Sequence, residues 1–76
     1  MYYIYRNGKL VGSSNDIEYV VEFTKLMIDK EISTEKDSIK LKQLYEDKLV
    51  LNSPKVGINQ LQHILARLEY SLEVDI

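Results

Sequence analysis

The chain has 76 residues, of which 45% are hydrophobic and 29% charged, with no cysteine and a formal net charge of -2 at pH 7. The lack of cysteine excludes disulfides, thiolate metal sites and a thiol nucleophile, and the length leaves little room for a buried catalytic pocket. We therefore interpret residues 1–76 as a single domain with a small core, for which association with itself or with a partner is the remaining source of added stability.

The first predicted element is a β-hairpin over residues 2–13. Asn7 and Gly8 stand between two apolar stretches, and an Asn-Gly pair suits the positive φ angles of a two-residue type I′ turn. Strand alternation then places two sets of side chains on opposite faces, with Tyr3, Tyr5 and Leu10 on one and Tyr2, Ile4 and Val11 on the other. Neither set is plainly polar, so we expect helices to cover one face and a partner to contact the other. The pattern leaves open which face is which.

A first helix is predicted over about residues 16–31. Asn15 followed by Glu18 is typical of a capping box at a helix start. Apolar side chains at helical spacing form two stripes, one of Ile17, Val20, Val21, Thr24, Met27 and Ile28 and one of Tyr19, Phe23 and Leu26. Because the stripes cover more than half of the circumference, we expect this helix to be central or to make contacts on two sides.

A second helix is predicted after the polar segment 33–37, with Ser33 or Thr34 as its cap. Its apolar face consists of Leu41, Leu44, Tyr45 and Leu49. Lys42 and Glu46 lie one turn apart, which is typical of a solvated helix surface. We therefore expect an ordinary amphipathic helix.

A third helix is predicted to start near Ile58, after Pro54 has ended the second. Apolar residues at alternating steps of three and four form a seam that consists of Ile58, Leu61, Leu65, Leu68 and Leu72. Two heptads are too few for a free coiled coil, so we interpret the seam as facing the core rather than as a dimerising zipper.

The last residues, 70–76, alternate between apolar and polar side chains. This alternation predicts a strand with Leu72, Val74 and Ile76 inward, although the helical seam overlaps it and both alternatives stay open. A third strand would stabilise the hairpin. The predicted fold class is α+β, with an N-terminal antiparallel hairpin, three helices and a short C-terminal strand that completes a small antiparallel sheet.

The sequence lacks the residue patterns of catalysis and of metal or cofactor binding. His63 is the only histidine, and the carboxylate pairs Glu18/Glu22 and Glu69/Glu73 are expected on solvated surfaces. We therefore expect no enzyme activity, no cofactor and no metal site. No stretch is apolar enough for a membrane span or a signal peptide, which predicts a cytoplasmic protein, or one in the host cytoplasm if a phage encodes it.

The aromatic hairpin favours a protein-binding function. Tyrosine is enriched at interface hot spots, and the candidate partner-binding residues are Tyr2, Tyr3, Tyr5, Arg6, Lys9 and Tyr19. A second copy of the chain is an alternative partner, which would make a homodimer. In size, in a residue bias typical of AT-rich coding sequences and in lack of catalytic residues, the chain resembles small phage and mobile-element accessory proteins. That resemblance implies an inhibitor of a host or defence protein, of the anti-CRISPR-like type.

The alternative function is DNA binding. Residues 41–69 resemble the helix-turn-helix of bacterial transcriptional regulators. In that interpretation Lys55 lies near phosphate, and the side chains that face base edges are Asn59, Gln60, Gln62, His63 and Arg67. The charge disfavours it, because residues 34–55 sum to +1 (five lysines, four acids) and residues 56–76 to -2 (one arginine, three acids).

Overall fold

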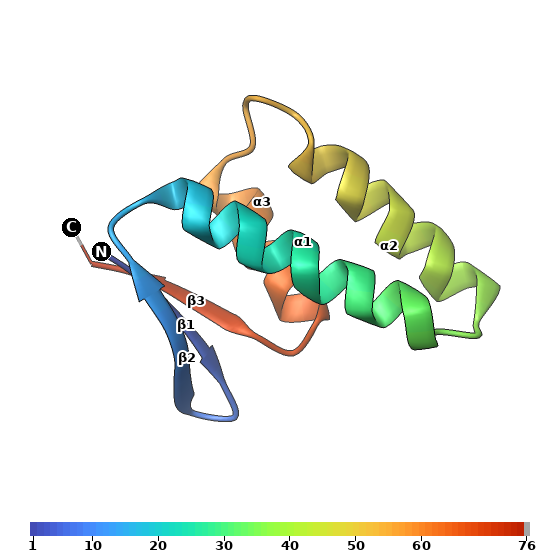
Figure 1. Ribbon diagram of the computed structural model, residues 1–76, viewed down its shortest axis with the longest axis horizontal. Coiled ribbons are helices and arrows are strands. Elements are labelled where there is room, and N and C mark those ends of the chain that lie inside the picture. The colour runs from blue at the N-terminus through green and yellow to red at the C-terminus, as the bar shows by residue number, and fades with distance from the viewer. Residues whose placement is uncertain (76) are drawn as a thin grey trace.

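A computed structural model describes residues 1–75 as a three-stranded sheet with three helices (Figure 1). The elements in chain order are β1 (Tyr2–Arg6), β2 (Lys9–Ser14), α1 (Ile17–Thr34), α2 (Ser38–Leu51), α3 (Ile58–Arg67) and β3 (Ser71–Val74). The strand order is β2-β1-β3, and β1 pairs antiparallel with both neighbours. The predicted α+β fold is confirmed, including the C-terminal strand. The inward placement predicted for Ile76 lies outside the described residues.

The hairpin turn forms as predicted, but the register beyond it does not. Asn7 and Gly8 have φ angles of 53° and 78°, as a type I′ turn requires. Ile4 pairs with Gly12 rather than with Val11, because a β-bulge shifts the register between Ile4 and Tyr5. The predicted pairing of Ile4 with Val11, which a two-residue turn without a bulge would give, is therefore wrong. The bulge places Gly12 under the Tyr19 ring, where a side-chain carbon would lie 2.6 Å from the tyrosine oxygen.

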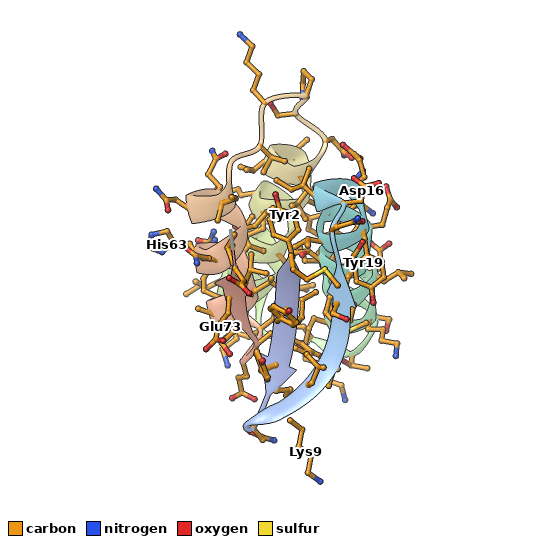
Figure 2. All side chains as sticks on the ribbon, turned by 90° about the vertical axis from the view of Figure 1, so that its left-hand side faces the viewer. Tyr2, Lys9, Asp16, Tyr19, His63 and Glu73 are labelled. Carbon is orange, nitrogen blue, oxygen red and sulfur yellow. The ribbon has the colours of Figure 1, made fainter. Side chains whose placement is uncertain are left out.

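The sheet has one covered face and one open face. Ile4 has no exposed surface, and its partner Leu72 on β3 is also buried, so this face lies against the helices. Strand alternation places the opposite set on the other side, and we name it the outer face: Tyr3, Tyr5, Leu10, Ser13, Ser71 and Glu73. Within residues 1–75 no helix crosses this face (Figure 2).

The central helix is α1, which contacts α2, α3 and the hairpin. This confirms the prediction of contacts on two sides. Asp16 rather than Asn15 caps it, since the Asp16 carboxylate accepts the Glu18 N–H at 3.0 Å. Between α1 and α2, Lys48 donates to the Asp29 carboxylate at 2.8 Å. That hydrogen bond and the charge of Asp29 raise the pKa of Lys48, so the contribution of charged Lys48 to stability is present at neutral pH and is lost as the pH rises through that pKa.

The boundary between α1 and α2 falls later than predicted. Ser33 and Thr34 stay within α1, where both hydroxyls donate to the Lys30 carbonyl of the preceding turn instead of capping a new helix. Asp37 caps α2 instead, with its carboxylate accepting the Ile39 N–H at 2.9 Å. The predicted caps for the second helix are therefore wrong.

The apolar seam predicted for the third helix continues from α3 into β3. Glu69 has a φ of 69°, and the Tyr70 N–H donates to the Leu65 carbonyl at 2.8 Å. Together with the bond from the Glu69 N–H to the Ala66 carbonyl, this is a Schellman motif, which ends the helix. Leu72 then continues the buried seam from a strand.

Candidate functional site

The outer face combines aromatic, aliphatic and acidic side chains from three strands. Tyr3 and Tyr5 come from the central strand β1 and are half-buried, and Leu10 of β2 is 53% exposed. Glu73 of β3 is exposed beside Tyr3, its partner across the strands. Figure 2 looks directly onto this face, with the helices behind the sheet. The structure thus leaves this aromatic surface without a covering helix, with its two tyrosines partly exposed.

The six predicted partner-binding residues do not form one surface. Only Tyr3 and Tyr5 lie together on the outer face. Tyr2 is half-buried on the helix side and packs against the core. Tyr19 lies on α1, beside β2 and over Gly12, and Lys9 is exposed at the hairpin turn (Figure 2).

Arg6 is the sixth of these residues, and it has partners within the molecule. Its Nη1 donates to the Tyr70 hydroxyl at 3.1 Å, and its guanidinium carbon lies 5.0 Å from the centre of the Tyr70 ring. Its Nη2 also lies 3.9 Å from Glu69 Oε2. The same ring contacts Phe23 of α1 edge-on, at 5.4 Å between ring centroids. Through Tyr70, Arg6 therefore connects the hairpin to α1. Sequence reasoning missed Leu10 as a member of the site, although it placed Leu10 with the two tyrosines.

The two sheet edges are poorly suited to strand addition. Met1 and Asp75 exchange two backbone hydrogen bonds, so by alternation the Leu72 carbonyl points away from β1. Gln62 of α3 donates to that carbonyl at 3.2 Å and occupies the β3 edge. The bulge interrupts the edge of β2, a known way to disfavour pairing. The outer face is thus a better docking surface than either edge.

Three of the six residues proposed to contact DNA are engaged within the molecule. Gln60 accepts the Gly57 N–H at 2.8 Å, Gln62 binds β3, and Arg67 binds Asp47 of α2. The other three, Lys55, Asn59 and His63, are exposed. The main contacts of α2 are with α1, and those of α3 are with α1 and β3. In a helix-turn-helix the two helices face one another across a short turn, so this arrangement gives the DNA-binding prediction little support.

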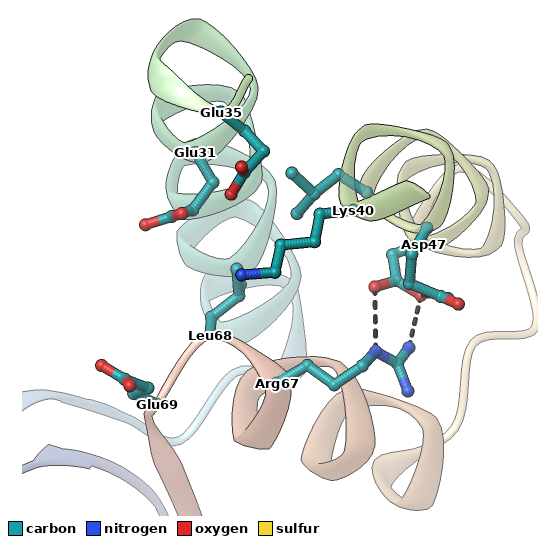
Figure 3. A pocket seen from close by; sticks show the side chains of 9 residues that line it. Glu31, Glu35, Lys40, Asp47, Arg67, Leu68 and Glu69 are labelled. Atoms are coloured by element: carbon teal, nitrogen blue, oxygen red, sulfur yellow. Dashed lines mark hydrogen bonds and ion pairs between the residues drawn. The ribbon is translucent and has the colours of Figure 1, made fainter. Parts of the chain in front are cut away.

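A partly buried ion pair joins α2 to α3 (Figure 3). Asp47 is only 4% exposed, and its carboxylate accepts from Arg67 Nε at 3.2 Å, from Arg67 Nη2 and from the Gln43 amide at 3.1 Å. Sequence reasoning missed this pair. The signal was the position of Asp47, three residues after Leu44 and four before Leu51, which places an acid in the buried stripe of the helix.

A hollow of about 380 Å³ lies beside this ion pair. Three carboxylates, Glu31, Glu35 and Glu69, line it together with Lys40 (Figure 3). Asp47 borders the hollow, but Arg67 and Gln43 already occupy its oxygens, which makes it a structural carboxylate. In the described part of the chain, no three metal-ligating side chains are close enough to hold one ion.

Comparisons with protein-family models, curated proteins and solved structures found no match to this chain. Among residues 1–75, no helix has both the length and the apolar character needed to cross a membrane. The most distinctive feature of the surface is the uncovered aromatic face of the sheet.

Proposed function

We propose that this protein is a small non-enzymatic binding module whose outer face docks onto another protein and inhibits it. The observation that carries the proposal is the pair Tyr3 and Tyr5, half-buried on the sheet face that no described helix covers, beside the exposed Leu10. We further propose that it is a phage or mobile-element accessory protein acting on a host or defence protein in the cytoplasm. The support for that class is its small size and its lack of a catalytic constellation.

The outer face has the properties of an interface centre. Tyrosine covers a large area with few rotatable bonds and keeps a hydroxyl for hydrogen bonding. Tyr3 and Tyr5 stand on β1, which is paired on both sides, so their backbone is already ordered before binding. This order reduces the entropy cost of association.

The size of the outer face suggests how a partner binds. Six side chains from three short strands are far fewer than the roughly 20 to 30 residues that each partner contributes to a standard interface. We expect the contact to extend beyond the tyrosines to the hairpin turn at Lys9 and to Tyr19 beside β2, both of which are exposed. Inhibition then follows from covering a surface that the partner needs.

The test replaces Tyr3 and Tyr5 together by threonine. Threonine suits a strand as well as tyrosine does but lacks the ring, so the fold is retained and the interface centre is lost. In an affinity pull-down from nuclease-treated bacterial lysate, the unmodified protein is expected to retain one protein in stoichiometric amount. The double variant is expected to retain at least about tenfold less, the equivalent of roughly 1.4 kcal/mol.

The matched control is Tyr45→Thr, which removes an exposed tyrosine from α2. This variant is expected to retain the protein as the unmodified chain does, with melting temperatures recorded for all three. Equal retention by the Tyr3/Tyr5 variant, or recovery of nucleic acid and its associated proteins alone from untreated lysate, would contradict the proposal. The second result would favour the DNA-binding alternative.

A further inference from the structure

The side of α2 that faces away from the core carries a stripe of side chains that would match the same stripe of a second, antiparallel helix. The stripe consists of Ile39, Lys42, Glu46 and Leu49, at steps of three, four and three residues. It lies opposite the buried residues Leu44, Asp47 and Leu51 of the same helix. Ile39 and Leu49 are 79% and 73% exposed, the highest fractions among the large hydrophobic residues that the structure describes as exposed.

From this stripe we infer that α2 pairs antiparallel with the α2 of a second copy of the chain. A two-fold axis that crosses the stripe halfway along it, between Lys42 and Glu46, brings Ile39 of one copy against Leu49 of the other, and the reverse. The same axis brings Lys42 of each copy against Glu46 of the other. One symmetry operation thus matches both apolar contacts and both ion pairs.

The charge pattern identifies a second copy as the occupant. Along the stripe the order is apolar, positive, negative, apolar, and the antiparallel copy presents the complementary order at every position. Parallel pairing would instead set Lys42 against Lys42 and Glu46 against Glu46. Because α2 is already folded on α1, the pairing does not carry the nucleation cost that makes short free helices unstable.

The expected dimer is weak and reversible. The 14 residues of α2 span about 21 Å, so the contact is smaller than a standard interface. In Figure 1 α2 lies on the far side of α1 from the sheet, which leaves the outer face of each copy free. The dimer is independent of the proposed function, and its effect would be to present two outer faces at once and raise avidity for a multivalent partner.

The test is a charge swap followed by sedimentation velocity over a range of concentrations. Lys42→Glu places glutamate against glutamate in the dimer, and Glu46→Lys places lysine against lysine. Each variant alone is therefore expected to associate at least about tenfold more weakly than the unmodified protein. An equimolar mixture of the two variants restores both ion pairs. It is expected to associate within about threefold of the unmodified protein.

The control is Lys55→Glu, the same charge change at an exposed position between α2 and α3. It is expected to leave association unchanged, and a further variant, Leu49→Asp, is expected to abolish association at an unchanged melting temperature. An unmodified protein that stays monomeric would overturn the inference, as would a mixture that does not recover or an equal loss in the control. Each of these results would leave the pull-down test of the outer face unaffected.

Discussion

Replacing Ile4 by alanine is expected to lower the free energy of unfolding by about 3 to 4 kcal/mol, whereas Leu10→Ala is expected to change it by less than about 0.5 kcal/mol. Ile4 has no exposed surface and faces the helices from the central strand, so the truncation leaves a cavity in the core. Leu10 is half-exposed on the outer face, where water fills the space. The two side chains lose the same number of carbon atoms. A difference in the free energy of unfolding between the two variants therefore reflects the face of the sheet on which each residue lies.

Urea unfolding followed by circular dichroism measures both variants. A domain of this size has roughly 4 to 11 kcal/mol of stability in total, so Ile4→Ala is expected to be partly unfolded or close to it at 37 °C. Ile4→Val, which removes one methyl group, should lose only about 1 kcal/mol and keep the transition measurable. A loss in Leu10→Ala as large as in Ile4→Ala would show that the outer face is covered by the chain itself.

Replacing Arg67 by alanine is expected to destabilise the protein by about 2 to 3 kcal/mol, or about 10 to 20 °C in melting temperature. The reason is that Asp47 would remain buried with only Gln43 as a partner. We expect a smaller loss of stability than for a fully buried pair, because the Arg67 side chain is 45% exposed and water can partly replace its guanidinium group. Thermal unfolding measures the change.

A double variant separates the ion pair from general packing. Asp47→Leu with Arg67→Met removes both charges together, and replacement of a buried pair by apolar side chains is often neutral or stabilising. The double variant is therefore expected to recover most of the stability lost in Arg67→Ala, while Lys55→Ala is expected to change nothing. If Arg67→Ala melts like the unmodified protein, the pair does not hold α3 to α2. Arg67 would then be free for the role assigned to it in the DNA-binding alternative.

Local features of the fold were predictable because neighbouring residues determine them. Asn7 and Gly8 specify their turn through backbone conformation alone. The spacing of apolar residues identified all three helices, since a helix that packs on one side repeats its buried positions every three or four residues. The alternation after Tyr70 likewise identified β3.

Features that depend on residues far apart in the chain were not predictable. The bulge brings Gly12 of β2 against Tyr19 of α1, a contact between separate elements, and the covered face of the hairpin follows from where the helices pack. The contact between Asp47 and Arg67 joins residues that are 20 positions apart. For the same reason the six predicted interface residues divide into an outer pair and four residues elsewhere. Sequence alternation grouped Tyr3 with Tyr5 but gave no sign of which group stays open.

Hydroxyl-radical footprinting of the captured complex tests the central claim most directly. The method measures, by mass spectrometry, which side chains lose solvent exposure when the protein retained in the pull-down is bound. We expect protection of Tyr3, Tyr5 and Leu10 on the outer face, with no change at His63 of α3. Protection confined to His63 and its neighbours on α3, with the outer face still reactive, would contradict the assignment of the outer face as the binding surface.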